Sequence, residues 1–129
     1  MVYNYNKSFS HIPAPCVGGV TVSSPQTEGK VVIEGIIESG AEMTVIPKWA
    51  IERLELSPVS MVEVRTWDGR ISKIPGYLIN LSIGNLIIKN LEVVSFDQDI
   101  ALLGRDVLNK FVITLDGKRG ILEIKEDEK

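Results

Sequence analysis

The chain has 129 residues, 44% hydrophobic and 24% charged, a balance typical of one folded globular domain and unlike that of a disordered chain. Fourteen Lys and Arg against seventeen Asp and Glu give a formal charge of −3, which offers no general attraction for phosphate backbones and argues against a nucleic-acid partner. The single cysteine, Cys16, excludes an intrachain disulfide.

Membrane and metal signals are missing from the sequence. The first fifteen residues interrupt their apolar side chains with polar ones, unlike a signal peptide. No apolar run approaches the ~20 residues that a membrane-spanning helix needs. One histidine and one cysteine do not supply the clustered ligands of a metal site. We therefore expect a cytoplasmic protein with no membrane partner, no metal and no cofactor.

Short β-branched runs alternate with turn signals along most of the chain, the pattern of an all-β domain built from hairpins. We expect an irregular leader at residues 1–15, one domain at 16–125 and a charged tail at 126–129. The first two strands are predicted at 19–22 and 30–37.

The middle of the chain predicts a strand, a short helix and a hairpin. Residues 43–46 are apolar and β-prone, and Pro47 can open a short helix that ends before Pro58. Strands at 62–66 and 70–74 flank Trp67-Asp68-Gly69, in which Asp-Gly is a strong hairpin signal. Because this hairpin carries several charged residues, we expect it to project from the domain.

The remaining elements are expected to supply the core and a terminal hairpin. Strands at 77–83 and 86–94 place four apolar residues on one face, which we expect to build the core: Tyr77, Ile79, Leu81 and Ile83. A strand, a short helix and two paired strands then follow, at 100–103, 106–111, 112–115 and 121–124. The sequence holds no internal repeat, so a two-fold symmetric site would need two chains.

Two segments carry the chemistry. The first, VIEGIIESGAEMTVIP, runs from an apolar strand into an acidic turn formed by Glu38, Ser39, Gly40 and Ala41. The second, ALLGRDVLNKFVITLDG, begins at Ala101. With the Asp-Gly hairpin between them, they resemble the retropepsin-like aspartic protease family over roughly residues 19–117. That family has a strand ending in Asp-Thr/Ser-Gly-Ala, a flap hairpin, and an apolar-apolar-Gly-Arg-Asp/Asn helix.

The resemblance implies an all-β, closed-barrel-like retropepsin (acid protease) fold with a flap hairpin and one or two short helices. It also implies a homodimer that hydrolyses a peptide or protein substrate. Two carboxylates, one per subunit, would share a proton; one would activate water while the other donates to the peptide carbonyl. Neither a metal nor a cofactor takes part in this chemistry.

The resemblance also assigns roles to the residues around the acidic turn. Ser39 would hydrogen-bond across the dimer axis, the alternative being a bond within its own loop. Small residues at Gly40 and Ala41 would avoid crowding beside the axis. Glu42 and Arg105 would form a structural ion pair, the alternative being two independent surface charges.

Two further assignments concern the hairpin and the short helix. Asp106 would cap the helix that follows it. The tip of the flap over a bound peptide would consist of Trp67, Asp68, Gly69 and Arg70. Alternatively, these residues are a simple hairpin turn, with Trp67 covering the rim of the core.

The acid itself departs from the family pattern. Glu38 stands where the family has aspartate, and its side chain is longer by one C–C bond, about 1.5 Å. Misplacement on this scale can cost ~10²-fold in rate, so we expect weak activity or none. A deliberate substitution and a natural variant are both consistent with the sequence.

Two other functions compete with the protease hypothesis. The first is a catalytically inactive dimeric module of the same fold that binds extended peptide by strand addition. The second is a serine hydrolase that uses Ser39. The sequence argues against it, because Gly-x-Ser-x-Gly is absent and the only histidine, His11, lies in the leader.

Overall fold

Strands dominate the structure, as the hairpin pattern predicts. The computed structural model describes residues 1–66 and 68–126. In chain order the elements are β1 (Val2–Asn4), β2 (Cys16–Ser23), β3 (Lys30–Ile37), β4 (Val45–Pro47), α1 (Lys48–Arg53), β5 (Ser60–Arg65), β6 (Ile71–Ile83), β7 (Leu86–Phe96), β8 (Ala101–Leu103), α2 (Arg105–Leu108), β9 (Val112–Asp116) and β10 (Ile121–Lys125).

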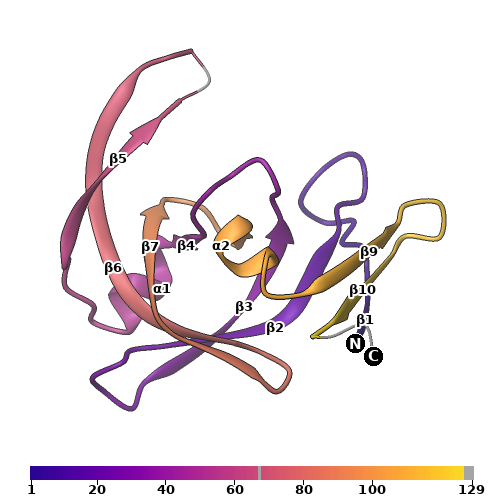
Figure 1. Ribbon diagram of the computed structural model, residues 1–129, viewed down its shortest axis with the longest axis horizontal. Helices are drawn as coiled ribbons and strands as arrows, with labels where there is room; N and C mark the ends of the chain where they lie inside the picture. Colours follow the sequence, from indigo (N-terminus) through magenta and orange to yellow (C-terminus); the bar gives the residue numbers. More distant parts are fainter. Residues whose placement is uncertain (67, 127–129) are drawn as a thin grey trace.

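A closed barrel forms the centre of the molecule (Figure 1). Within the described part of the chain, six strands form its ring in the order β2-β3-β8-β4-β7-β6. The ring closes because β6 returns to pair with β2, with Thr21 opposite Ser82 and Ser23 opposite Asn80. Two of the pairs of adjacent strands, β3–β8 and β4–β7, are parallel. The other pairs in the ring are antiparallel.

The barrel interior is filled by alternate residues of the strands. Ile79, Leu81 and Ile83 on β6 are buried, and Tyr77 packs half-buried against the same cluster, which confirms the predicted core face. Helix α1 covers part of the core with Ala50 and Ile51. It begins directly after Pro47, as predicted, and Pro47 itself ends β4 and holds the N-cap position with extended rather than helical backbone.

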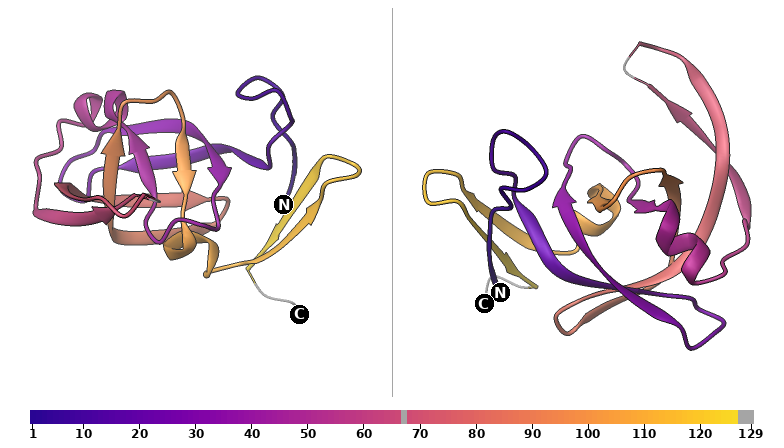
Figure 2. Two further views of the ribbon diagram at one scale, coloured as in Figure 1. Left: turned by 90° about the horizontal axis from the view of Figure 1, so that it is seen from above. Right: turned by 180° about the vertical axis from the view of Figure 1, so that it is seen from behind.

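The hairpin of β5 and β6, hereafter the β5–β6 hairpin, extends beyond the barrel. Strand β5 pairs with β6 alone, and the two curve away from the body past the end that carries the β3–β4 connection (Figures 1 and 2). Strand β6 is continuous, whereas separate strands at 70–74 and 77–83 were expected. Pro75 is tolerated within it because the pairing with β7 starts one residue later, at Gly76.

A second sheet of three strands, in the order β1-β10-β9, brings the two ends of the chain together (Figure 1). The terminal hairpin β9–β10 is confirmed. The leader differs from prediction, because Val2–Asn4 is a strand paired with β10 and Asn6 forms a bridge with Ala14. Of the predicted tail, residues 127–129 lie outside the described residues.

Helix α2 ends at Leu108, earlier than the predicted helix at 106–111. No helix in the described ranges is long and apolar enough to cross a membrane.

Cys16 is buried at the start of β2. Its thiol lies 3.6 Å from a carboxylate oxygen of Glu34, which also accepts a 2.7 Å hydrogen bond from the Asn6 side chain. Burial, followed by the nearby charge of Glu34, raises the pKa of the Cys16 thiol to about 12. The thiol is therefore protonated, and unreactive, near neutral pH.

Candidate active site

Glu38 is placed by the parallel pair β3–β8. It follows the last residue of β3, and its backbone N–H donates to the Leu103 carbonyl at 2.9 Å, extending the pairing of Ile37 with Leu103 by one residue. On its other side, the Ile37 N–H donates to the Pro15 carbonyl at 3.0 Å. The acid is thus fixed to two neighbouring segments of backbone, and its side chain is half-buried.

The turn after Glu38 folds back on the carboxylate. The Gly40 N–H donates to Glu38 Oε1 at 3.1 Å, and the Ala41 N–H donates to the Glu38 carbonyl at 3.3 Å. A Cβ atom added to Gly40 would lie 3.1 Å from Glu38 Oε1, so a side chain there would crowd the acid. The positive-φ glycines of the described chain are elsewhere, and Gly40 therefore provides space rather than left-handed backbone.

Helix α2 braces this turn through its first residues. The Arg105 N–H donates to the Ala41 carbonyl at 2.8 Å, and the Asp106 N–H donates to the Glu42 carbonyl at 3.2 Å. The guanidinium of Arg105 donates from Nη1 to the Ser39 carbonyl at 2.9 Å. The turn and the helix are 66 residues apart at this contact, so they are joined only by folding.

The predicted ion pair between Glu42 and Arg105 is not present. Both line a shallow pocket of about 410 Å³ with Asp106, Asn109 and Lys110, but the ion pairs of the described residues are elsewhere. The guanidinium instead satisfies the Ser39 carbonyl, which has no strand partner. Glu42 is exposed, so water solvates its carboxylate and pairing would gain little.

Asp106 is not the N-cap residue of α2, contrary to prediction, and Gly104 holds that position without a side-chain bond. The carboxylate of Asp106 accepts from the Val107 N–H in the first turn of α2 at 2.9 Å, and it also binds Thr44. It accepts from the Thr44 N–H at 3.0 Å and from the Thr44 hydroxyl at 2.7 Å. A cap is unnecessary because the first N–H groups of α2 already donate to the carbonyls of Ala41 and Glu42.

Thr44 is a positioning residue that the sequence analysis missed. It is fully buried, and its hydroxyl also accepts from the Gly104 N–H at 3.0 Å. Gly104 lies against this segment so closely that a Cβ atom would be 2.6 Å from the Met43 carbonyl carbon. Thr44, Gly104 and Asp106 therefore lock the end of the acidic turn onto α2. The sequence signal was a lone polar residue inside an apolar run.

The tip of the β5–β6 hairpin is organised by Asp68. Its carboxylate accepts from the Thr66 hydroxyl, from the Arg70 N–H at 3.1 Å and from Arg70 Nε at 2.8 Å. The Thr66 hydroxyl, followed by the Arg70 N–H, lowers the pKa of Asp68. Gly69 has a φ of +87°, a conformation that glycine adopts without strain. Trp67 lies outside the described residues.

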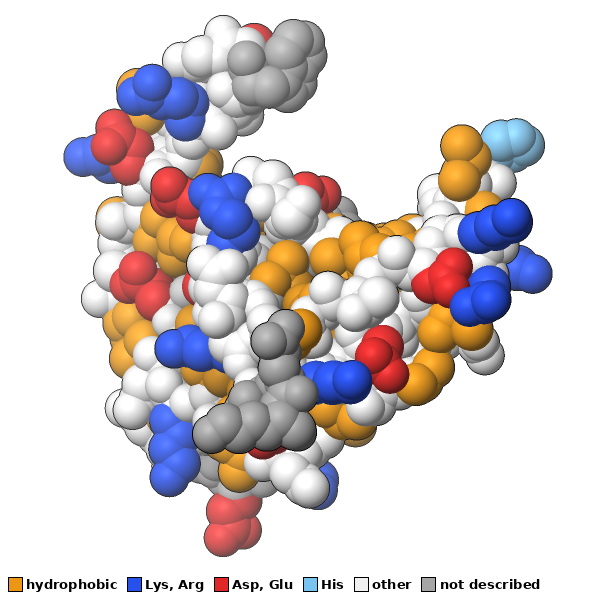
Figure 3. Space-filling model, turned by 45° about the vertical axis from the view of Figure 1, so that its right-hand side comes forward, with side chains coloured by type: hydrophobic (Ala, Val, Ile, Leu, Met, Phe, Trp, Pro, Cys, Tyr) orange, Lys and Arg blue, Asp and Glu red, His pale blue; other side chains and the backbone are white. Residues whose placement is uncertain are grey.

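The two faces of this hairpin differ in character. Val62, Val64 and Ile74 are half-buried on one face, whereas the opposite face exposes Met61, Glu63, Arg65, Ile71 and Lys73. In the space-filling view the hairpin stands clear of the body, and hydrophobic side chains are visible on the hollowed surface beside it (Figure 3). No hydrogen bond joins the described residues of the hairpin tip to the acidic turn.

Comparison with known proteins agrees with this architecture. The model of the gag-polyprotein putative aspartyl protease family matches residues 25–110 of the chain. No curated protein matches the sequence.

Solved structures with the same fold include three proteases. A retropepsin-like aspartic protease from Rickettsia conorii has a TM-score of 0.66 and 19% identity, over 96% of this chain and 88% of that one. The EIAV protease in complex with the inhibitor HBY-793 has a TM-score of 0.54 and 16% identity, over 83% and 92%. The simian foamy virus (mac) protease has a TM-score of 0.51 and 18% identity, over 70% of this chain and 91% of that one.

The family match spans both the acidic turn and the Gly104-Arg105-Asp106 segment, and the solved structures share the barrel that joins them. The chain therefore belongs to the gag-polyprotein putative aspartyl protease family and has the retropepsin-like fold.

Proposed function

We propose that this chain is one subunit of a homodimeric aspartic endopeptidase scaffold, in which Glu38 occupies the position of the family's aspartate and weakens or silences hydrolysis. The observation that carries the proposal is the anchored, half-buried Glu38 at the end of β3, in a turn braced by α2. Each chain supplies one such carboxylate. A proton-sharing pair therefore needs a second copy.

The terminal sheet supports a symmetric dimer. In the described sheet β9 is an edge strand, and it carries Val112, Ile113 and Leu115, of which Leu115 is 52% exposed. An unpaired apolar edge is a template for strand addition. An antiparallel strand can pair with its own copy about a two-fold axis, so β9 suits an interface between identical chains.

The β5–β6 hairpin supports a peptide substrate. Its face of Val62, Val64 and Ile74 offers apolar contacts to alternate side chains of an extended peptide, and Asp68, Gly69 and Arg70 shape the tip. We assign this hairpin as the flap that covers the substrate and excludes water. In this role Ser39 would contact the partner's turn across the axis.

Restoring the family's acid tests the proposal. Glu38→Asp should raise peptide hydrolysis about 100-fold, because the shorter side chain allows two carboxylates to share one proton. Cleavage of a mixed peptide library at acidic pH, followed by mass spectrometry, measures the gain, and pepstatin should block it. Glu38→Gln is the matched control and should be inert. A folded, dimeric Asp variant that cleaves nothing would contradict the protease proposal.

That last outcome would favour the second candidate, an inactive peptide-binding dimer. The observation behind it is Glu38 itself, together with a hairpin whose apolar face is intact. The unmodified chain would then bind extended peptides without cleaving them. Calorimetric titration with a peptide library, compared between the native chain and Val64→Asp, would detect such binding.

A further inference from the structure

An open cavity of about 620 Å³ lies far along the chain from the acidic turn, between the N-terminal loop and the β9–β10 turn. Its lining consists of Asn4, Tyr5, Lys7, Ile12, Pro13, Gly117, Lys118, Arg119 and Gly120. None of these residues belongs to the barrel or to the Glu38 turn. The protease chemistry therefore does not account for this cavity.

The cavity is held open by backbone bonds. Asn6 and Ala14 exchange hydrogen bonds of 2.8 and 2.9 Å that close the N-terminal loop at its base, and the Tyr5 N–H donates to the Gly120 carbonyl at 2.8 Å. On the other wall, Asp116 accepts from the Arg119 N–H at 3.0 Å and fixes the turn. Both walls are thus in place without a ligand, which lowers the entropic cost of binding one.

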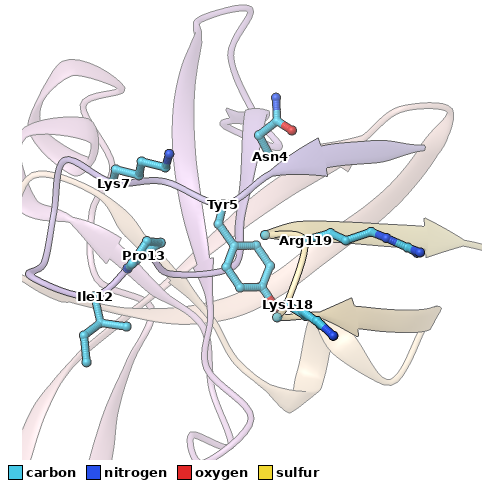
Figure 4. Close-up of a pocket in the computed structure, with 9 residues that line it drawn as sticks. Asn4, Tyr5, Lys7, Ile12, Pro13, Lys118 and Arg119 are labelled. Atoms are coloured by element: carbon cyan, nitrogen blue, oxygen red, sulfur yellow. The ribbon is translucent and has the colours of Figure 1, made fainter.

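The Tyr5 side chain lies between the two walls (Figure 4). A Cβ atom on Gly117 would be 4.0 Å from the Tyr5 hydroxyl oxygen, so the ring reaches across to the turn. Lys7 and Lys118 lie on opposite sides of this ring, and Ile12 and Pro13 line the loop side (Figure 4). The head of Arg119 extends away from Tyr5 and pairs with Asp116 at 3.2 Å.

The charge of this cavity is opposite to that of the whole chain. Three of its described lining residues are basic and none is acidic, whereas the chain carries a formal charge of −3. Figure 3 shows several Lys and Arg side chains at this edge of the molecule, with Asp and Glu side chains between them. The ion pairs of the described residues leave Lys7 and Lys118 without a carboxylate partner. A locally positive cavity on an acidic protein selects a negatively charged ligand.

We propose that this cavity binds an acidic peptide segment, with one apolar side chain against Tyr5, Ile12 and Pro13 and carboxylates on Lys7 and Lys118. The apolar wall distinguishes such a segment from a bare anion, since Ile12 is 74% exposed and gains from being covered. A phosphate backbone fits less well, because it carries no apolar side chain to cover Ile12 and Pro13.

Titration of the ¹⁵N-labelled chain with an acetylated Glu-Glu-Leu-Glu-Glu peptide tests the proposal. The amide signals of Tyr5, Lys7, Ile12, Lys118 and Gly120 should shift together, with the dissociation constant on the order of 0.1 mM that a small, partly apolar contact supports. Affinity should fall as salt is added, because ion pairs with exposed cations are screened. The Gln-Gln-Leu-Gln-Gln peptide should bind at least about tenfold more weakly.

Two kinds of variant separate the contribution of the cavity's charge to peptide binding from the contribution of its shape. Lys7→Gln with Lys118→Gln should weaken the acidic peptide about tenfold, whereas Lys30→Gln with Lys89→Gln, an equal change of charge at exposed sites elsewhere, should leave affinity unchanged. Gly117→Leu fills the cavity without changing its charge and should also weaken binding.

Several results would overturn the proposal. The peptide idea fails if inorganic phosphate shifts the same amides at equal concentration, or if the Gln peptide binds equally well. It also fails if single-stranded RNA binds more tightly than the acidic peptide. Retention of full affinity by both cavity variants would place the binding elsewhere. Because Glu38 plays no part in these titrations, their outcome is independent of the test for hydrolysis.

Discussion

At the scale of single residues, Thr44 holds the acidic turn to α2. Thr44→Val keeps the shape of the side chain but removes the hydroxyl that donates to Asp106 and accepts from Gly104. Because the buried Gly104 N–H loses its acceptor and the half-buried Asp106 carboxylate loses one donor, the free energy of unfolding should fall by about 1–3 kcal/mol. Urea denaturation followed by circular dichroism measures the loss.

The exposed Thr27 offers a matched control for this substitution. Thr27→Val makes the same chemical change in a loop where the hydroxyl is solvated, and it should alter stability by less than about 0.5 kcal/mol. Equal effects of the two substitutions would show that the Thr44 hydroxyl does not stabilise the turn.

Cys16 gives stability a dependence on alkaline pH. Its thiol pKa is raised from the model-compound value of 9.0 to about 12 in the folded chain, so above pH 9 the unfolded chain loses a proton that the folded chain keeps. Stability from this group is complete below pH 9 and decreases as the pH rises toward 12. Thermal denaturation should show a steeper decline over this range for the native chain than for Cys16→Ala. Parallel curves for the two proteins would contradict the assignment.

At the scale of elements, the β5–β6 hairpin should loosen at its tip without affecting the barrel. Asp68→Ala removes the carboxylate that binds Thr66 and Arg70. The Arg70 amide should then exchange with solvent at least about tenfold faster, while the urea midpoint stays unchanged, since the tip opens locally. Asp97→Asn is an exposed control elsewhere. Unaltered exchange at Arg70 would show that Asp68 does not order the tip.

The lowered pKa of Asp68 has a consequence for acidic conditions. The carboxylate stays ionised, and stays bound to Arg70, to a lower pH than an ordinary aspartate would. The tip should therefore remain ordered under the acidic conditions that favour a shared-proton carboxylate pair.

Most elements could be predicted because their signals are local. Alternation along residues 77–83, the Asp68-Gly69 turn and Pro47 each fix the backbone within a few residues, and all three appear as expected. Strand β1 was missed because Val2–Asn4 lies in a stretch where polar residues interrupt the apolar ones, unlike the apolar runs that contain β4 and β8. Its partner in β10 lies about 120 residues away, at Glu123 opposite Val2.

Predictions within the site depended on contacts that sequence order does not contain. The structure brings the turn and the Gly104-Arg105-Asp106 segment together, but the bonds between them differ from those expected. Arg105 binds the Ser39 carbonyl rather than Glu42, and Asp106 lies inside α2, where it accepts from the backbone N–H groups of Thr44 and Val107. In each case the side chain binds a backbone group that has no partner within a strand or helix. The position of such a group cannot be read from residue types.

At the scale of the whole molecule, the edge of β9 should control assembly. Leu115→Lys places a charge on the exposed apolar edge, and charges on edge strands oppose strand addition. We expect the native chain to have the mass of a dimer at micromolar concentration in analytical ultracentrifugation, and the variant to shift to monomer. In the Glu38→Asp background the same substitution should abolish hydrolysis, because each chain supplies only one acid.

Ile87→Lys is the control for this experiment. Ile87 is also exposed and apolar, but it lies on β7 in the barrel, away from the terminal sheet. It should leave the dimer intact. A native chain that is monomeric at high concentration, or a dimer unaffected by Leu115→Lys, would rule out this interface.

At the joint between β4 and β8, the two strands are paired at one position, Val45 opposite Leu102. Few backbone hydrogen bonds therefore close the barrel there. The hydrogen bonds from Thr44 to the Asp106 carboxylate lie beside this joint and contribute to closing the barrel. The contact that joins the end of the acidic turn to α2 therefore also helps to close the barrel. Substitutions that loosen it should open the barrel at the β4–β8 joint as well as the turn, whereas substitutions in the β5–β6 hairpin should leave that joint intact.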